Sequence, residues 1–211
     1  SCGIDITKIA EYSEKRGILK MIDLSLASGQ RAASIVENML TFSRKEYART
    51  EPADISEILE KTLELAASDY DLKKSYDFRK IKVVREYQSD LPLVPCEKNK
   101  MQQVFLNIFR NGAQSMSSSC EDARESVFIV KVYVKRKMVC IEIMDNGPGM
   151  DEETKKRVFE PFFTTKPVGQ GTGLGLSLSY FIVTENHGGF MDAESEPGKG
   201  CKIIVRLPLN R

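Results

Sequence analysis

Hydrophobic residues recur every three or four positions between Ile18 and Lys45, which predicts one long helix with an apolar face. The repeat runs through positions 18, 21, 25, 28, 32, 35, 39 and 42, and small residues form its middle. Three further residues widen the stripe: Leu26, Val36 and Leu40. Such a helix cannot bury its face alone, so we expect it to join a helical bundle or to pack on its own domain. Residues 1–17 have room for one short helix around Ile6–Lys15.

A mixed pattern of helices and strands follows the polar stretch Tyr47–Pro52, which predicts a linker because it ends in proline. The periodicity predicts helices at Ile55–Ala67 (after Asp54 as N-cap), Glu97–Met116, Asp151–Phe159 and Leu174–Asn186. It predicts strands at Ile81–Tyr87, Leu93–Pro95, Phe190–Glu194 and Cys201–Leu207, and a hairpin of Val127–Lys135 with Met138–Met144 around Arg136 and Lys137. Helices and strands do not alternate strictly, which favours an α+β fold, a two-layer α/β sandwich, over a doubly wound sheet. We divide the chain into a leading segment (1–17), a bundle helix (18–47) and a globular domain (48–211).

The composition limits the possible functions. The 211 residues carry a formal net charge of +1, so there is no bulk electrostatic argument for nucleic acid or an anionic membrane. The sequence has no apolar run of about 18 residues, so we expect any membrane anchor of the parent protein outside this stretch. The five cysteines are scattered without metal-binding spacing, which predicts free thiols in the cytoplasm. The chain begins with Ser-Cys-Gly rather than Met, which indicates a fragment.

The predicted helix Glu97–Met116 has an unusual polar face. Four amide side chains fall within an arc of about 80°: Gln103, Asn107, Asn111 and Gln114. Amide oxygens can coordinate a hard cation and amide nitrogens can donate to phosphate, without adding negative charge beside an anion. The face therefore indicates a phosphate and metal site, or else a solvated polar surface.

The segment Asp145-Asn-Gly-Pro-Gly-Met150 directly follows a predicted strand. The carboxylate of Asp145 can accept a hydrogen bond from an exocyclic amine. Gly147 and Gly149 would let the backbone approach a flat ring. The same residues would also form an ordinary tight turn, so this segment alone leaves both interpretations open.

Alternating glycines lead into the predicted helix at Leu174, in the segment Gly169-Gln-Gly-Thr-Gly-Leu-Gly-Leu176. Exposed N–H groups at a helix start favour an anion, which predicts a phosphate cradle. A flexible linker is the alternative, although a linker would not be followed by so apolar a helix. In the preceding segment Phe159–Lys166 the phenylalanines can anchor a loop, and Lys166 offers a point charge for phosphate.

The order and spacing of these segments resemble those of sensor histidine kinases of two-component systems, within the ATPase superfamily that includes gyrase, Hsp90 and MutL. The similarity covers about residues 18–208. Four segments resemble the N, G1, F and G2 boxes of that family, in this order: Gln103–Met116, Asp145–Met150, Phe159–Lys166 and Gly169–Leu176. Gly198-Lys-Gly200 resembles a third glycine box. Residues 31–44 resemble the second helix of the dimerisation and histidine-phosphotransfer domain, through which family members dimerise as a four-helix bundle.

The resemblance implies ATP and Mg²⁺ as cofactors and assigns roles to residues. Asp145 would accept from the adenine amino group, while Asn111 would bind Mg²⁺ with Asn107 and Gln103 nearby. Asn107 and Lys166 would take part in catalysis. The remaining contacts to the nucleotide would come from Lys166, Gly147, Gly149, Gly171, Thr172, Gly173, Leu174 and Gly175. Two positions depart from the common pattern: Gln114, where many relatives have a phosphate-contacting lysine, and Cys201, where Thr or Ser beside the adenine is usual.

The single histidine, His187, lies at a predicted helix end before two glycines, which predicts a structural role and not a phosphate acceptor. The resemblance implies transfer of the γ-phosphoryl group of ATP to a histidine on an upstream helix absent from this chain, and relay to a response regulator. The implied partners are that helix, a receiver domain and a second copy of the chain, but no nucleic acid. The alternatives are an ATP-driven conformational switch and a nucleotide-binding scaffold. Hydrolytic relatives have a glutamate where this chain has Asn107, and an amide cannot act as a general base.

Overall fold

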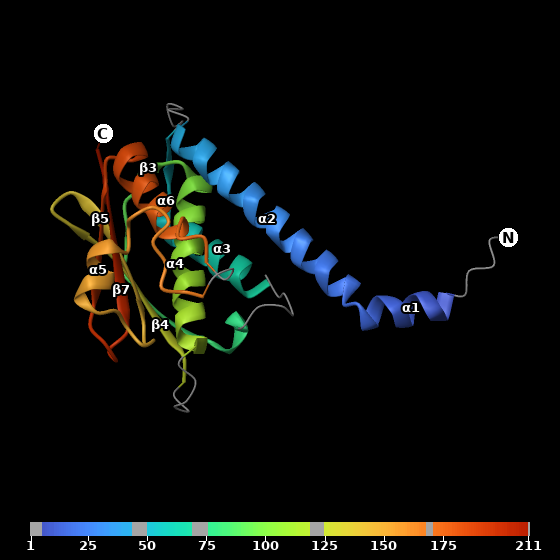
Figure 1. The fold of residues 1–211 in the computed structure, drawn as a ribbon. Coiled ribbons are helices and arrows are strands. Elements are labelled where there is room, and N and C mark those ends of the chain that lie inside the picture. Colours follow the sequence, from blue (N-terminus) through green and yellow to red (C-terminus); the bar gives the residue numbers. More distant parts are fainter. Residues whose placement is uncertain (1–5, 44–49, 69–75, 119–124, 168–170, 211) are drawn as a thin grey trace. The chain divides into compact units, whose positions relative to one another are not determined.

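The computed structural model describes residues 6–43, 50–68, 76–118, 125–167 and 171–210 (Figure 1). The chain divides into two compact units, Ser1–Arg44 and Lys45–Arg211. No helix within the described ranges combines the length and the apolar character that a membrane span requires. The two units are described separately below.

The described part of the first unit consists of two helices, α1 (Ile6–Lys15) and α2 (Ile18–Ser43), at the places predicted from the sequence. Gly17, with a φ of 62°, ends α1 in the left-handed conformation that glycine adopts without strain. Several large apolar side chains of α2 are more than half exposed: Leu19, Met21, Ile22, Leu24, Leu26 and Val36. The described part of this unit therefore leaves these six apolar residues of α2 uncovered, as expected of a helix that needs a partner.

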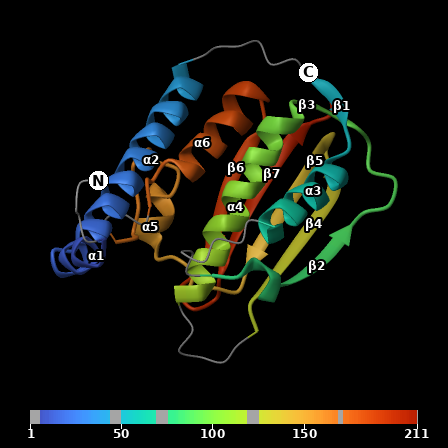
Figure 2. The same cartoon turned by 90° about the vertical axis from the view of Figure 1, so that its right-hand side faces the viewer.

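The second unit has two layers, a five-stranded sheet and a layer of helices on one of its faces (Figure 2). The strand order is β2-β4-β5-β7-β6, and all neighbours are antiparallel except β2 and β4. The strands are β2 (Lys82–Tyr87), β4 (Val127–Lys135), β5 (Met138–Asp145), β6 (Phe190–Ser195) and β7 (Cys201–Pro208). The covering helices are α3 (Ile55–Ser68), α4 (Lys98–Ser118) and α6 (Gly175–Phe181), and α5 (Glu152–Arg157) follows β5. The predicted two-layer α+β sandwich is therefore confirmed.

A small second sheet corrects the predicted linker. Strand β1 (Glu51–Ala53) pairs antiparallel with β3 (Val94–Cys96), so the chain is already ordered at Glu51. The linker prediction for Tyr47–Pro52 is wrong over its last two residues, while residues 47–49 lie outside the described part. Pro52 was the reason for that prediction. It is compatible with a short strand that has a single neighbour, because proline is tolerated at sheet edges.

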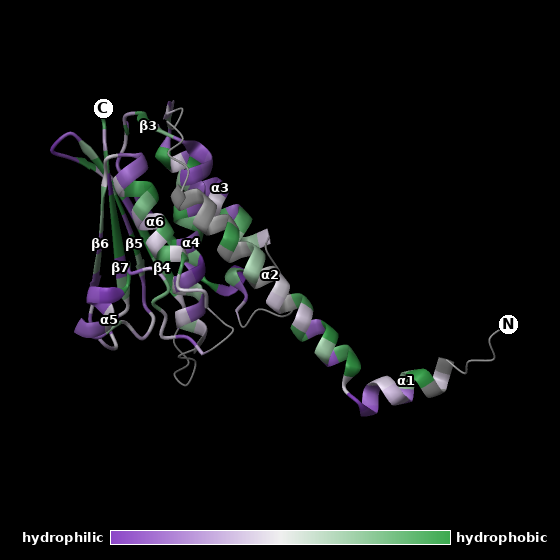
Figure 3. Cartoon of the chain, turned by 45° about the horizontal axis from the view of Figure 1, so that its top comes forward, coloured by the Kyte–Doolittle hydropathy of each residue, from purple (hydrophilic) through white to green (hydrophobic). Residues whose placement is uncertain are grey.

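The core lies between α4 and the sheet. The apolar face predicted for α4 is buried there, through Met101, Val104, Phe105, Ile108, Phe109 and Met116. Phe78, Phe109 and Phe128 form an aromatic cluster with ring centroids 5.3–6.1 Å apart. Phe78 belongs to a short 3₁₀ helix (Phe78–Lys80) that the sequence did not predict. Figure 3 shows hydrophobic colours along the strands of the sheet and hydrophilic ones on α5.

Two local signals act where the sequence predicts them, whereas one predicted helix differs in type. The Asp54 side chain accepts from the backbone of Ser56 at 2.8 Å, which confirms it as the N-cap of α3. Arg136 and Lys137 both have positive φ, as a two-residue turn between antiparallel strands requires. The predicted helix Leu174–Asn186 is in fact α6 followed by one π-helical turn, Ile182–Asn186.

Candidate nucleotide site

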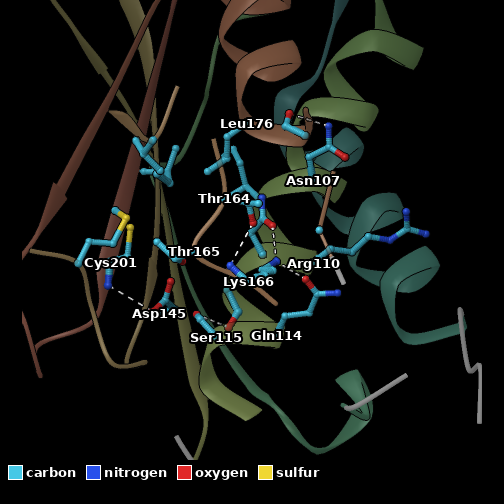
Figure 4. A pocket seen from close by; sticks show the side chains of 18 of the residues that line it. Asn107, Arg110, Gln114, Ser115, Asp145, Thr164, Thr165, Lys166, Leu176 and Cys201 are labelled. Carbon is cyan, nitrogen blue, oxygen red and sulfur yellow. Dashed lines mark hydrogen bonds between the residues drawn. The ribbon is translucent and has the colours of Figure 1, made fainter. Parts of the chain in front are cut away.

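A cavity of about 420 Å³ lies between α4, the end of β5 and the loop segment that leads to α6 (Figure 4). It brings together residues that lie far apart in the sequence, from α4 to β7. The predicted site residues that line it are Asn107, Asn111, Asp145, Gly149, Lys166, Gly171, Thr172, Gly173 and Gly175. The predicted residues that do not line it are Gln103, Gly147 and Leu174. Further residues that the sequence analysis did not name as site residues also line the cavity, among them Arg110, Ser115, Thr154 and Thr164. All of these but Thr154 lie within the segments that resemble the N and F boxes.

Asp145 is held rigidly at the sheet side of the cavity. Its Oδ1 accepts from the backbone N–H of Gly147 at 3.0 Å and of Cys201 at 3.2 Å. Among the described residues no hydrogen bond uses Oδ2, so this oxygen is available to a ligand in the cavity. Burial raises the pKa of Asp145 above its ordinary value, and the two backbone N–H donors oppose that shift.

The glycines around Asp145 are required by backbone packing. A Cβ on Gly149, whose φ is 71°, would lie 2.0 Å from the carbonyl oxygen of Glu196. A Cβ on Gly200 would lie 2.0 Å from the carbonyl oxygen of Asp145. Gly147 supports the carboxylate by its N–H donation and does not line the cavity. Close contact between two backbone segments therefore requires glycine at positions 149 and 200, whereas the predicted approach of Gly147 and Gly149 to a flat ring stays a prediction.

Cys201 lines the cavity beside Asp145. Burial raises the pKa of its thiol to about 12, and the neighbouring carboxylate acts in the same direction. The side chain is therefore a neutral thiol at physiological pH, which makes it a weak hydrogen-bonding neighbour for a ligand and not a nucleophile.

Lys166 crosses the cavity from its loop to α4. Its Nζ donates to Oδ1 of Asn111 at 3.1 Å and also to Oε1 of Gln114. Burial lowers the pKa of Lys166, as expected for an ammonium group removed from water. Gln114, which departs from the family pattern, is thus a direct partner of the loop lysine.

The amide oxygens of α4 fit a cation. The oxygens of Asn111 and Gln114 converge on the positive charge of Lys166, which shows that they can face such a group together. No group of His, Cys, Asp and Glu residues in the described ranges could hold a metal ion. A Mg²⁺ ion in this cavity would therefore depend on amide oxygens and on the oxygens of its ligand.

Asn107 connects α4 to the first turn of α6. Its Nδ2 donates to the carbonyl oxygen of Gly175 at 3.1 Å and to Oγ of Ser179 at 3.3 Å. A Cβ on Gly175 would lie 3.7 Å from Cγ of Asn107, so the two helices are in contact here. The amide nitrogen of Asn107 is thus engaged in positioning α6.

The loop before α6 is anchored at its base. Phe162 has a φ of 66° and donates from its backbone to the carbonyl oxygen of Gly173 at 3.0 Å. Gly173 has a φ of 67°, and a Cβ there would lie 2.4 Å from the carbonyl carbon of Phe162. Phe159 packs against Tyr180 with ring centroids 5.2 Å apart, and Arg157 covers the ring of Phe163. These contacts confirm that Phe159 and Phe163 anchor the loop through their rings, whereas Phe162 contributes through its backbone. Gly169 and Gln170 lie outside the described residues.

His187 is buried, and both of its ring nitrogens are engaged. Nε2 accepts from the backbone N–H of Glu97 at 3.0 Å, so Nδ1 carries the proton that is donated to the carbonyl oxygen of Ile182 at 2.8 Å. The ring ties the π-helical turn to the start of α4. This geometry supports the predicted structural role.

Comparisons with known proteins find a matching family model and similar sequences. Residues 96–211 match the model of a family described as histidine kinase-, DNA gyrase B-, and HSP90-like ATPase. Sporulation kinase E of Bacillus subtilis is 31% identical over 86% of this chain and 23% of its own length. The signal transduction histidine-protein kinase AtoS of Escherichia coli is 32% identical over 83% of this chain and 27% of its own length. The chain thus spans about a quarter of the length of these curated relatives.

Solved structures show the same fold. The catalytic domain of the histidine kinase ThkA has a TM-score of 0.61 at 24% identity and covers 76% of this chain and 95% of that one. Full-length ShkA in complex with AMPPNP has a TM-score of 0.71 at 22% identity, over 92% of this chain and 39% of that one. ThkA in complex with the response regulator TrrA also has a TM-score of 0.71, at 21% identity, over 97% of this chain and 57% of that one. Since the family model covers more than half of the chain, this protein belongs to the histidine kinase-, DNA gyrase B- and HSP90-like ATPase family.

Proposed function

We propose that this chain is the ATP-binding kinase part of a two-component sensor histidine kinase. It would transfer the γ-phosphoryl group of ATP to a histidine on an upstream helix, for relay to a response regulator receiver domain. The observation that carries this proposal is the cavity itself, which combines an available carboxylate oxygen of Asp145 with the ammonium of Lys166 and the amide of Asn111. The names of the curated relatives, and the solved complexes with AMPPNP and with a response regulator, support the same conclusion.

The residues suit the separate parts of an adenine nucleotide. Oδ2 of Asp145 would accept from the exocyclic amine of adenine, while the glycine-bounded turns keep that carboxylate in place. Lys166 would bind the phosphates as a point charge. Asn111 would hold Mg²⁺, which would neutralise charge on the phosphates. Catalysis would then be a matter of positioning, since the acceptor imidazole is itself the nucleophile.

Hydrolysis of ATP fits this site less well than transfer to histidine. Among the described residues that line the cavity, Asp145 is the only carboxylate. Its two backbone hydrogen bonds hold it where it would accept from the adenine amine, so it would not act as a general base toward water. Asn107 offers only an amide, whose nitrogen is bonded to α6. None of the described residues that line the cavity near Lys166 can therefore take a proton from water at neutral pH.

The proposed partners follow from the first unit. The exposed apolar residues of α2 support pairing with an upstream helix and with a second copy of the chain.

The free thiols of Cys96, Cys140 and Cys201 support a cytoplasmic location.

Phosphoryl transfer to a supplied helix tests the proposal. The chain is incubated with γ-labelled ATP and Mg²⁺, alone and together with the upstream segment of its parent protein. We expect acid-labile label on the supplied segment and none on the chain alone, with Asn111→Ala as the inactive control. Label on the chain alone that disappears in His187→Gln would overturn the proposal, and so would the absence of ADP binding in calorimetry.

A further inference from the structure

Lys166 is a partly buried cation without a counterion in the described part of the chain. Its ammonium donates to two neutral amide oxygens, from residues 55 and 52 positions away in the sequence. No described carboxylate pairs with it, and burial in this place disfavours its charge. A charge held only by neutral acceptors is stabilised further when an anion reaches it, because charge-assisted bonds are the stronger ones.

One of the two acceptors is the proposed metal ligand. The Asn111 oxygen accepts a hydrogen bond from the Lys166 ammonium at 3.1 Å. A divalent cation bound to the same oxygen would lie within a few ångströms of the ammonium, where two positive charges repel strongly. Asn111 therefore cannot hold Lys166 and Mg²⁺ together at these distances.

A polyphosphate in the cavity resolves this competition. It offers Lys166 an anionic acceptor. When the ammonium moves to that acceptor, the amide oxygen of Asn111 still faces the space that the ammonium occupied, and another cation can enter there. Gln114 adds a second neutral oxygen to that place. Lys166 also lies on the loop, so its change of partner moves a loop residue away from α4.

We infer that Lys166 is a stand-in for the metal ion: its ammonium occupies the oxygens of Asn111 and Gln114 until nucleotide phosphates draw it away, which opens the Asn111 oxygen to Mg²⁺. This inference rests on the proposed function. It describes how Lys166 would control the entry of Mg²⁺ into that site. It implies that the nucleotide must enter before the metal is bound tightly.

Calorimetric titration of ADP in EDTA and in excess Mg²⁺ tests the inference. The measured quantity is the Mg²⁺ enhancement, the Kd in EDTA divided by the Kd in Mg²⁺. Lys166→Met should weaken binding in EDTA roughly 10- to 100-fold, as expected for a lost charge-assisted bond. It should also lower the enhancement below that of the wild type, because the metal ion no longer needs the nucleotide to release the Asn111 oxygen. Lys166→Arg should restore binding in EDTA. Lys156→Met, which removes an exposed lysine outside the cavity, is the matched control and should change neither quantity.

A double variant separates competition for Asn111 from general repulsion between cations. In the Asn111→Ala background, Lys166→Met should not lower the enhancement, because the shared oxygen is gone. A decrease that persists in this background would overturn the inference, as would an equal or larger enhancement in Lys166→Met than in the wild type. If the wild type binds no ADP in either buffer, the proposed function fails as well. Wild-type binding with equal enhancement removes only the inference.

Discussion

Replacing Asp145 by asparagine should separate base recognition from structural support. The carboxylate oxygen Oδ1 accepts from the backbone of Gly147 and Cys201, and an asparagine oxygen can take both bonds. Burial raises the pKa of Asp145, so its folded-state pKa lies above the unfolded value. At neutral pH the ionised group therefore lowers the free energy of unfolding, and this loss disappears as the pH falls through the folded pKa toward the unfolded one. Asp145→Asn should raise the stability of the nucleotide-free protein by about 0.5–2 kcal/mol.

Asp145→Ala is the matched comparison. It removes the acceptor from the two backbone N–H groups, and each buried donor left without a partner costs about 1–3 kcal/mol. Thermal unfolding without nucleotide should thus give a higher Tm than the wild type for asparagine and a lower one for alanine. The gain for asparagine should shrink in acidic buffer, where the wild-type carboxyl becomes protonated.

Nucleotide binding should fall in both variants. Asparagine places an amide donor where Oδ2 would accept from the adenine amine, and alanine places nothing there. The loss of a buried hydrogen bond of about 1–3 kcal/mol corresponds to roughly 5- to 150-fold in the Kd for ADP. Calorimetry on the folded variants measures it. Wild-type affinity in Asp145→Asn would refute the role of this residue in base recognition, and a lowered Tm for that variant would refute the account of its burial.

Three further predictions follow from the same geometry. Gly173→Ala should lower the Tm and abolish ADP binding, since its Cβ would lie 2.4 Å from the Phe162 backbone. The control Gly198→Ala, with φ 77° and open space around it, should lower the free energy of unfolding by only about 1–2 kcal/mol. His187→Gln should destabilise the protein by about 1–3 kcal/mol in denaturant unfolding but leave phosphorylation of a supplied helix in its folded fraction. The wild type should release phosphate from ATP no faster than about 1 s⁻¹, and Asn107→Glu should be faster at saturating ATP; an unchanged rate would contradict the argument from the missing base.

Short-range patterns in the sequence were enough to predict most helices and strands of the fold. The alternation that predicts α4 depends only on neighbours three and four positions apart, and the helix buries the predicted apolar face. The cap at Asp54 and the turn at Arg136 and Lys137 act within a few residues, so their chemistry can be read directly from the sequence. The position of Asp145 at a strand end was equally local.

Contacts between distant segments required the tertiary structure. Pro52 suggests a linker until its pairing with Pro95 is known. Gln103 shares the polar face of α4 with Asn111 but does not line the cavity, because periodicity gives the direction of a side chain around a helix and not which stretch of its length the loop covers. The bond between Lys166 and Gln114 joins positions 52 residues apart, and no spacing in the sequence encodes it. The sequence alone thus determines which residue types face one way on each element, whereas the packing of elements determines which of them meet, because that depends on the path of the whole chain.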